Sequence, residues 1–374
     1  MQQAVIAGYV RTPFTFARKG ALAGVRPDDL AAVAIKALVQ RTGIDPATLE
    51  DVLLGCAYPE AAQGNNIARI ASLLAGLPIE VAGATVNRFC GSSMSAIHIA
   101  AGQIAIGAGE AFIAGGVESM TQVPQGGFNF SPNPSLMEAY ISMGETAENV
   151  AAQYGVSRAA QEELAFASQQ KAAAAQAAGR LRDEIAGVMT EAGLVDVDGC
   201  LRPQTTLEGL AGLKPAFRPD GSVTAGTASP LTDGASATLV TSEAYAAAHG
   251  LEPLARIKAA AVAGCPPEIM GMGPVPATLK ALARAGLTID DIDVVEINEA
   301  FGSQAVACIR ELGIPPEKVN IDGGGISIGH PLGATGARIT GKAAQILKRE
   351  GGRYALSTQC IGGGQGVATI LEAM

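Results

Sequence analysis

The order of apolar helix, turn and strand occurs twice in this sequence. Residues 30–55, LAAVAIKALVQRTGIDPATLEDVLLG, have the pattern of an apolar helix, a glycine turn and a strand. Residues 274–298, PVPATLKALARAGLTIDDIDVVEIN, repeat that order, although the two turns align only with an insertion. Each copy then continues through a strand and a turn into a second apolar helix. We therefore expect a fold made of two similar halves.

Local patterns within the halves indicate several further elements. The chain should open with a strand over residues 4–7, followed by a loop that carries Arg11. The first apolar helix is expected over residues 30–40, and a buried strand over residues 51–56. The last segment, residues 353–372, reads as a hairpin.

The segment between the halves has a different composition. It is rich in Pro, Gly and Asn at first, becomes Ala-rich and helical over residues 158–179, and is again punctuated by Gly and Pro. Such a change marks an inserted loop domain. We therefore expect an N-terminal half over residues 1–119 and 233–254, a loop domain over residues 120–232, and a C-terminal half over residues 255–374.

Composition and charge restrict the class of protein. A chain of 374 residues exceeds what one hydrophobic core holds, and its 48% hydrophobic residues and 47 Gly fit an α/β protein with buried strands and tight turns. The net charge is −9, and no Lys/Arg cluster could follow a phosphate backbone, so we expect no nucleic-acid partner. The chain opening resembles no signal or transit peptide, and no apolar run approaches the roughly 20 residues of a membrane span. A cytoplasmic location is expected.

Six cysteines are scattered along the chain without any CxxC pair, so the spacing indicates neither a zinc site nor a disulfide framework. A lone intracellular Cys is usually a small buried hydrophobe. That interpretation is adopted for Cys56, Cys200, Cys265 and Cys308, and no metal site is expected.

Cys90 has the local sequence of a nucleophile. It lies where a strand ends and a helix begins, and Gly91 and Ser92 permit close approach of the backbone. A helix start offers free N–H groups and partial positive charge, which favour the thiolate and can hold an oxyanion. From local sequence alone, a buried Cys at a helix cap is an equal alternative.

A nucleophile needs a base, and the chain has three histidines. His98 lies eight residues along the same helix as Cys90, about 12 Å away at 1.5 Å per residue, which is too far for a hydrogen bond. His249 precedes a Gly at a helix end, a position that favours partial positive charge without any further function. His330 occupies the glycine-dense turn ISIGHPLGATGAR ahead of a helix, where the imidazole can be aimed into a cleft. His330 is the favoured base.

Cys360 and Asn298 are ambiguous when taken singly. Cys360 ends a strand that runs into glycines, and it could be a core cysteine or a second redox thiol. Asn298 also ends a predicted strand, where polar site residues of open α/β sheets gather. An Asn that caps the following helix is the commoner explanation.

Taken together, the motifs resemble the thiolase family, whose order they follow over essentially the whole chain. They are NRFCGSSM (87–94), GGVES (115–119), MGETAEN (143–149), TAGTAS (224–229), GMGPVPA (271–277), NEAF (298–301), GHPLGATGAR (329–338) and CIGGGQG (360–366). The resemblance implies the thiolase fold, which is two βαβ-type halves in a five-layered αβαβα arrangement with an inserted loop domain.

The resemblance implies a role for each catalytic residue. Cys90 would take the acyl group as a thioester after activation by His330, and Cys360 would move the proton at the carbon alpha to the thioester. Asn298 would hold a water that forms one oxyanion hole with His330. The backbone N–H groups of Cys90 and Gly362 would form the other, and preorganised donors of this kind stabilise developing oxyanions.

The resemblance also implies where CoA lies, mainly on the loop domain. The residues that would line the pantetheine or acyl path are Ser229, Phe217, Ala225, Met143, Met272 and Phe301. Coenzyme A would be a co-substrate, and no permanently bound cofactor is implied. Family members are usually homodimers or homotetramers, and some work in a complex with hydratase and dehydrogenase subunits.

The motifs are closer to the 3-ketoacyl-CoA thiolases of fatty-acid oxidation than to the acetoacetyl-CoA-forming members. Ser142 stands where the latter often carry His, and Thr227, Pro230 and Thr232 alter the loop near Ser229. We therefore expect thiolytic cleavage of 3-ketoacyl-CoA. Two alternatives remain at this point: an acetyl-CoA acetyltransferase, and a non-catalytic thiolase-like carrier of acyl-CoA or lipid.

Overall fold

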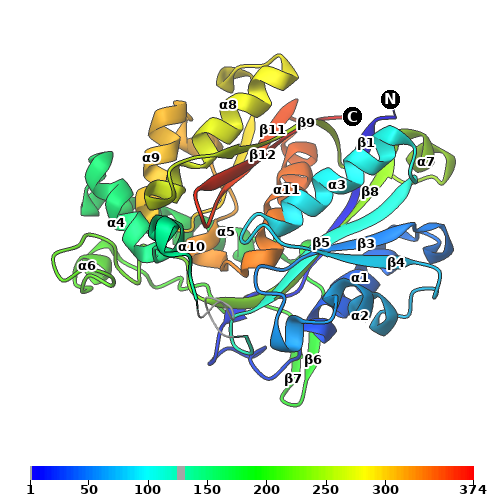
Figure 1. The fold of residues 1–374 in the computed structure, drawn as a ribbon, viewed down its shortest axis with the longest axis horizontal. Coiled ribbons are helices and arrows are strands. Elements are labelled where there is room, and N and C mark those ends of the chain that lie inside the picture. The colour runs from blue at the N-terminus through cyan, green and yellow to red at the C-terminus, as the bar shows by residue number, and fades with distance from the viewer. Residues whose placement is uncertain (1, 124–130) are drawn as a thin grey trace.

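The structure is a computed structural model, and it describes residues 2–123 and 131–374. Nine strands follow one another in a continuous mixed sheet, in the order β10-β11-β12-β9-β1-β8-β5-β3-β4, and the short β2 pairs with β8. The two halves of this sheet join where β1 pairs with β9, through Val5 with Arg256 and Ile6 with Ala255. Figure 1 shows β3, β4 and β5 on one side of the molecule, and β9, β11 and β12 on the other.

The repeated pattern of the sequence is present in both halves. The first half comprises β1 (Ala4–Arg11), β2 (Thr15–Phe16), α1 (Pro27–Thr42), β3 (Asp51–Gly55), α2 (Ile67–Leu74), β4 (Ala82–Val86), α3 (Ser92–Ile106), β5 (Ala111–Ser119), β8 (Thr232–Ser242) and α7 (Glu243–Ala248). The second comprises β9 (Ala255–Gly264), η5 (Pro267–Met272), α8 (Pro274–Ala285), β10 (Val294–Ile297), α9 (Gly302–Leu312), α10 (Gly325–Ile328), α11 (Leu332–Glu350), β11 (Tyr354–Ile361) and β12 (Gln365–Glu372). The expected helix over residues 30–40, the strand over residues 51–56 and the closing hairpin are confirmed.

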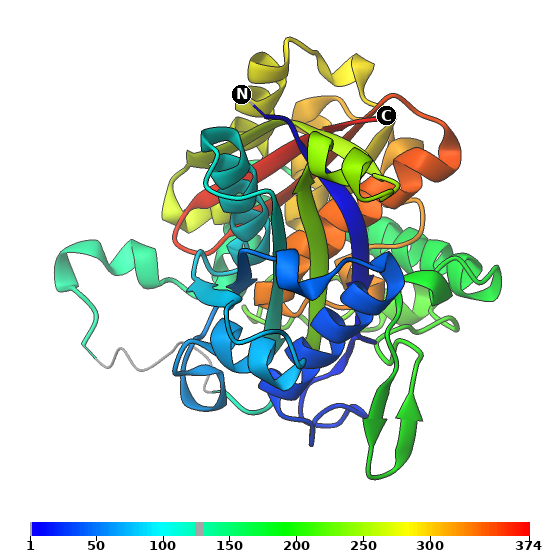
Figure 2. The ribbon, with the colours of Figure 1, turned by 90° about the vertical axis from the view of Figure 1, so that its right-hand side faces the viewer.

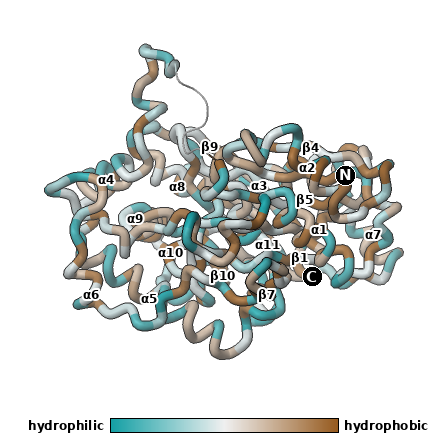
Figure 3. The backbone as a smooth tube through the Cα atoms, turned by 90° about the horizontal axis from the view of Figure 1, so that it is seen from below, coloured by the Kyte–Doolittle hydropathy of each residue, from teal (hydrophilic) through white to brown (hydrophobic). Residues whose placement is uncertain are grey.

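The segment between the halves contributes short elements and two longer helices. They are η3 (Pro134–Tyr140), α4 (Met143–Gln153), α5 (Arg158–Ala177), η4 (Arg182–Glu184), β6 (Val188–Thr190), β7 (Gly193–Val195) and α6 (Leu207–Ala211). The helix η3 projects from the rest of the molecule (Figures 2 and 3). The β6-β7 hairpin lies at one edge of the molecule (Figure 2). Residues 124–130 of the expected loop domain lie outside the described residues, and the division into three units stays a prediction.

The apolar clusters show the five layers. One cluster joins α1 and α2 to strands of the first half, and another joins α8 and α9 to strands of the second half. Between them, α3 and α11 share a cluster with strands of both halves, including Leu53 of β3 and Leu371 of β12. The order is therefore helix, sheet, helix, sheet, helix, as the resemblance implied, and α3 and α11 form the central layer.

The first strand is longer than the sequence indicated and includes Arg11, which was expected in a loop. Pairing of β1 with β8 continues to Arg11 and Ser236, so Arg11 is the last residue of the strand and lies in no loop. Its guanidinium is fully buried and donates to both Asp198 oxygens at 2.6 and 2.7 Å and to Glu184 at 2.8 Å. These partners come from the inserted segment, so local sequence could not reveal them.

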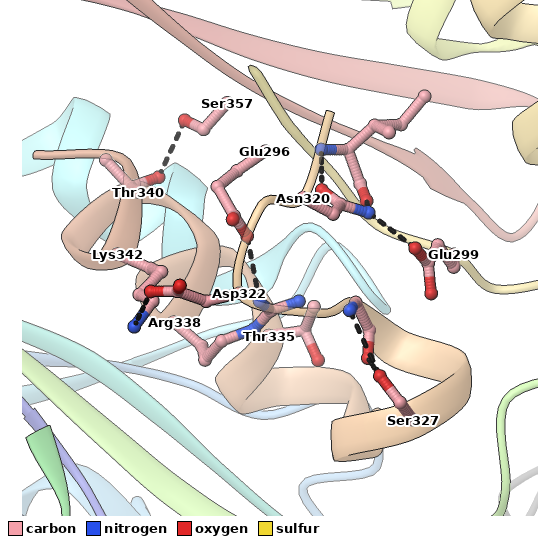
Figure 4. Close-up of polar contacts among 12 residues, drawn as sticks. Glu296, Glu299, Asn320, Asp322, Ser327, Thr335, Arg338, Thr340, Lys342 and Ser357 are labelled. Carbon is pink, nitrogen blue, oxygen red and sulfur yellow. Dashed lines mark hydrogen bonds and ion pairs between the residues drawn. The ribbon is translucent and has the colours of Figure 1, made fainter. Parts of the chain in front are cut away.

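Buried ion pairs hold the central helix α11 in place. Arg338 donates to Glu296 at 2.9 Å, and Lys342 lies 3.0 Å from Glu184 and 2.9 Å from Asp322. Figure 4 shows the pairs of Arg338 with Glu296 and of Lys342 with Asp322 along this helix. Removing one partner of a buried pair leaves an uncompensated charge, which typically costs about 3–5 kcal/mol. The position and rotation of α11 are therefore strongly fixed.

The window Phe89–Ile106, which contains α3, is 18 residues long and apolar enough to cross a membrane by length and composition. This corrects the expectation that no apolar run approaches such a length. Half of the window is buried inside the protein, and Ala96, Ile97 and Ala100 pack in the central layer between the two halves of the sheet. Here α3 is a core helix.

Candidate active site

The turn before α3 presents Cys90. Phe89 has a φ of +43°, a left-handed value that is uncommon for a residue with a side chain. The turn is held by its own polar groups, because the Phe89 N–H donates to Asn87 Oδ1 at 2.9 Å and the Arg88 N–H donates to Ser92 Oγ at 2.9 Å. Cys90 follows this turn, two residues before the helix begins. The predicted position of Cys90 between a strand and a helix is confirmed.

Gly91 brings this turn against the end of β11. A Cβ at Gly91 would lie 2.5 Å from Cδ1 of Ile361, so a side chain there would force the Ile361 side chain to move. The Gln359 side chain also donates to the Cys90 carbonyl. Close approach through Gly91 therefore places Cys90 beside the strand that carries Cys360.

The sulfur of Cys90 accepts hydrogen bonds from two backbone N–H groups, those of Gly362 and of Cys90 itself. Both hydrogen bonds lower the pKa of the thiol. Burial outweighs them and raises the pKa to about 12, and the charge of Glu118 acts in the same direction. The expectation that the helix start favours the thiolate is therefore wrong for the resting site. The N–H groups are in place, but desolvation is the larger effect, so Cys90 is a thiol at neutral pH.

His330 is buried between α10 and α11. Its Nδ1 lies 2.6 Å from Thr335 Oγ1 and its Nε2 lies 3.3 Å from Asn298 Nδ2. The main-chain N–H of His330 donates to Thr232 Oγ1 at 3.0 Å, which anchors the turn. Burial, and secondly the charge of Arg338, lower the pKa of His330 to about 3. The imidazole is therefore neutral at physiological pH, as a base must be.

Asn298 follows β10 and faces His330, so two residues that the sequence placed 32 positions apart are in contact. Its Oδ1 is buried and has no hydrogen-bond partner among the described residues. Gly325 leaves the space beside this oxygen, since a Cβ there would lie 2.7 Å from it. A buried acceptor without a partner is suited to a bound water. The alternative role of Asn298 as a helix cap is not seen, because the cap of α9 is Phe301.

Cys360 is buried near the end of β11, opposite Gly366 of β12. Burial raises its pKa well above the ordinary value, and the nearby charge of Cys90 adds to that effect. Cys360 also belongs to an apolar cluster with Phe301 and Met143. The structure thus brings a second thiol close to Cys90, on the side where the inserted segment packs.

The residues expected along the CoA path divide into two groups. Phe217 packs edge-on against Phe301 with ring centroids 5.9 Å apart, and its ring lies over Gly144 beside Met143. Ser229 donates through both its N–H and its hydroxyl to the Ala300 carbonyl at 3.0 Å. These residues and the exposed Ala225 lie on segments that meet at the start of α9. Met272 lies elsewhere, in the apolar cluster beneath α8 and α9, and Met270 takes a place in the cluster of Cys360.

A pocket of about 410 Å³ opens at Cys90. Its lining residues are uncharged, and they are Tyr58, Phe89, Cys90, Pro132, Ala139, Tyr140, Ile141, Ser142, Met143, Leu332, Gly362 and Gly363. Leu332 follows His330 by two residues, so the turn that carries the base borders the same pocket as the thiol. The volume and apolar lining suit an uncharged acyl chain.

Glu118 lies in the motif GGVES, and local sequence indicates no role for it. Its buried carboxylate accepts from the N–H groups of Ala57 and Gly333 at 2.8 Å, and from the Gln63 amide at 2.7 Å. It thereby ties the start of α11 to the loop after β3. An acidic residue at the end of a buried strand is a signal that sequence reasoning could have used. Thr335, five residues after His330, carried no such signal.

The remaining cysteines and histidines occupy positions in the core, at a helix end or in a partly exposed loop, and these positions explain them without a catalytic role. Cys56, Cys200 and Cys308 are buried, as expected, and Cys265 is partly exposed. His98 Nε2 lies 2.8 Å from Thr369 Oγ1, with the pKa lowered to about 4 by burial. His249 caps α7 and stacks on Tyr245 at 3.9 Å.

Comparison with known families gives matches along the chain. The family model described as the N-terminal domain of thiolase matches residues 4–244, and the model described as its C-terminal domain matches residues 251–373. The matches meet near the point where the two halves of the sheet join.

Similar proteins share this sequence over its full length. The 3-ketoacyl-CoA thiolase of Pseudoalteromonas translucida (strain TAC 125) is 49% identical, over 100% of this chain and 99% of its own. A beta-ketoadipyl-CoA thiolase of Escherichia coli is 47% identical over 100% of both chains. The crystal structure of human mitochondrial 3-ketoacyl-CoA thiolase in complex with CoA superposes with a TM-score of 0.94 at 39% identity, over 100% of this chain and 98% of that one.

The raised pKa of Cys90 predicts how its reactivity depends on pH. With a pKa of about 12, the thiolate fraction should rise about tenfold per pH unit from pH 7 to pH 9, and alkylation by iodoacetamide should rise with it. Quantifying the Cys90 peptide by mass spectrometry, with N-acetylcysteine as the reference thiol, measures this. A rate that is already level above pH 7 would show that the N–H groups outweigh burial.

Proposed function

The chain belongs to the thiolase family and is an acyltransferase, and from this premise we propose that it cleaves 3-ketoacyl-CoA with free CoA through an acyl thioester on Cys90. One observation carries the assignment of the nucleophile: the N–H groups of Cys90 and Gly362 both point at the Cys90 sulfur, and Cys360 lies beside it. Donors in that position can also hold the oxygen of an acyl group attached to that sulfur.

In the first half-reaction, His330 takes the proton of Cys90 as its sulfur bonds to the 3-keto carbon. Both groups are neutral at rest, so proton transfer accompanies the attack. The bond between C2 and C3 then breaks, and its electron pair remains on the departing acetyl-CoA. Cys360 protonates that carbon and is left as a thiolate. The unpartnered Oδ1 of Asn298 supports a water that would stabilise the enolate oxygen together with His330.

In the second half-reaction, the thiol of CoA gives its proton to the Cys360 thiolate and attacks the thioester on Cys90. The acyl group passes to the sulfur of CoA. Cys90 leaves as a thiolate and recovers its proton from His330, which restores the resting state. Every proton is returned, so the residues present need no permanently bound cofactor for this cycle. Coenzyme A is the co-substrate of this family, and the human relative has been solved with it.

The pocket beside Cys90 supports an acyl chain longer than that of acetoacetyl-CoA. Its volume of about 410 Å³ exceeds what a methyl group fills, and Ser142 and Met143 at its border leave the space open. Among the described residues that line the pocket there is no cationic side chain to pair with a terminal carboxylate, which disfavours 3-ketoadipyl-CoA despite the similarity to a beta-ketoadipyl-CoA thiolase. A role in fatty-acid β-oxidation follows from such a substrate. The cytoplasmic location and a complex with hydratase and dehydrogenase subunits stay predictions from the sequence.

A homo-oligomer is supported by one edge of the sheet. Strand β4 is the last strand in the sheet order, and its neighbours α2 and α3 expose Leu73, Leu74 and Ile99 at 42%, 53% and 39%. An exposed strand edge beside apolar side chains favours pairing with another chain. We therefore propose that a second copy of this chain covers β4 and the adjoining helices.

Replacing Cys360 should separate the two half-reactions. Acyl transfer from an acyl-CoA to Cys90 forms no carbanion, so Cys360→Ala should still acquire the acyl group, as measured by mass spectrometry. Thiolysis of 3-ketoacyl-CoA should fall about 10²- to 10⁴-fold, because a general acid–base group is lost. Cys90→Ala is the control and should lose both. Equal loss of labelling and thiolysis in folded Cys360→Ala would assign Cys360 to support of the nucleophile.

The acyl pocket predicts an order of substrates. We expect kcat/KM for 3-ketooctanoyl-CoA to be at least equal to that for acetoacetyl-CoA, and about tenfold or more above that for 3-ketoadipyl-CoA. The loss of ketoacyl absorbance measures all three. A strong preference for acetoacetyl-CoA would instead favour the acetyltransferase activity.

The proposed interface predicts a mass of two or four times 37.7 kDa in sedimentation velocity. Ile99→Glu should place a charge in the interface and shift the protein toward the monomer at low concentration. Leu194→Glu changes an equally apolar residue, 57% exposed on the β6-β7 hairpin outside the proposed interface, and should leave the mass unchanged. A wild-type monomer would contradict the proposal.

A further inference from the structure

We propose that Thr335 is a positioning residue that holds His330 in the tautomer with its proton on Nδ1, so that Nε2 keeps the lone pair needed to deprotonate Cys90. The inference rests on the proposed function, since the tautomer matters for turnover only if His330 acts as a base. A neutral imidazole has two tautomers, and the hydrogen bond at one nitrogen decides which nitrogen is free.

The contacts of Thr335 favour one direction for the hydrogen bond at Nδ1. Thr335 is fully buried in the first turn of α11, and its Oγ1 lies 2.6 Å from Nδ1. The same hydroxyl donates to the Pro331 carbonyl at 2.9 Å. A hydroxyl has a single proton. When that proton is given to Pro331, Oγ1 accepts from the ring, and Nδ1 carries the hydrogen.

The contact at Nε2 leads to the same tautomer. Asn298 Nδ2 lies 3.3 Å from Nε2, and an amide nitrogen can only donate. A proton on Nε2 would place two donors against one another. It would also draw the Thr335 proton to Nδ1 and away from the Pro331 carbonyl, which would keep only the N–H groups of Ala334 and Thr335 as donors. Both nitrogens are therefore satisfied together by only one arrangement of protons.

Burial keeps the ring neutral and so makes this choice relevant, and the second contribution comes from Arg338. It lies three residues after Thr335 on α11, and Figure 4 shows both side chains along this helix, with Arg338 bonded to Glu296. Burial and the charge of Arg338 both disfavour the imidazolium, in which each nitrogen carries a proton and no lone pair remains. α11 thus contributes two effects to His330: Arg338 favours one proton on the ring, and Thr335 sets where that proton lies.

Two substitutions separate the hydrogen bond from packing. Thr335→Ser keeps the hydroxyl and loses a methyl group, whereas Thr335→Val keeps the shape and loses the hydroxyl. The chain has three histidines, so ¹⁵N NMR of histidine-labelled protein gives three sets of ring signals, and His330→Asn identifies that of His330. Wild type and Thr335→Ser should show Nδ1–H. Thr335→Val should shift His330 toward Nε2–H or a mixture of tautomers.

Single-turnover acylation of Cys90 by acyl-CoA gives the kinetic readout. Thr335→Val should slow acylation about 10²-fold, at the lower end of what general acid–base catalysis contributes, with little change in KM, and Thr335→Ser should stay within tenfold of wild type. Nε2–H in the wild type would overturn the inference, as would full acylation by Thr335→Val. Equal loss in Thr335→Ser and Thr335→Val would also overturn it, because the methyl group would then be what matters. A wild type that shows Nδ1–H but never acylates Cys90 would refute the proposed function and leave the tautomer assignment intact.

Discussion

The crossing of the two central helices decides where the chemistry of this protein is placed. Gly336 of α11 has no side chain, and a Cβ there would lie only 2.4 Å from the backbone nitrogen of Met94 in α3. The helices therefore touch backbone to backbone, within two turns of the N-terminus of each. Cys90 precedes α3 by two residues and His330 precedes α11 by two. A thiol and a base that are far apart in sequence are thus delivered to the same end of the central layer.

Burial then sets the resting state of the two groups. Desolvation raises the pKa of Cys90 and lowers that of His330, so each is neutral although they are suited to exchange a proton. The N–H groups at the Cys90 sulfur act against desolvation without overcoming it. Their role is therefore better described as donation to the oxygen of the acyl group, which becomes negative during the reaction. A resting thiol also resists oxidation and adventitious alkylation better than a thiolate.

Buried carboxylates keep the arrangement rigid. Glu118 holds the start of α11 against the loop after β3, and Glu296 pairs with Arg338 one turn behind Thr335. Glu299 accepts from Asn320, as Figure 4 shows. It also accepts from Ser168 and from the Ile326 N–H, so it joins the loop of Asn298 to α5 and to α10. Site residues on separate loops therefore share supports within the core, and a precise geometry does not depend on any one loop.

The sequence by itself determined the class of fold and the candidates for chemistry. Periodicity and the repeat gave two α/β halves, and elimination among three histidines left His330, because local spacing alone excluded His98. The order of the motifs indicated the family. The resemblance to that family then indicated the catalytic roles of Cys90, Cys360 and Asn298. What the sequence could not determine was the balance of forces at those residues. The thiolate expected at Cys90 follows from the helix start, which is local, but burial by distant segments is larger.

Only the tertiary structure decided the remaining features. Arg11 looked like a loop residue because its partners, Asp198 and Glu184, are supplied by a segment more than 170 positions away in the chain. Met270 rather than Met272 reached the cluster of Cys360, because the side chains of η5 divide between two apolar clusters. The environment of His330 depends on Asn298, which lies in the loop after β10. Short-range patterns specify which elements form, whereas desolvation, ion pairing and contact between loops are set by which elements pack together.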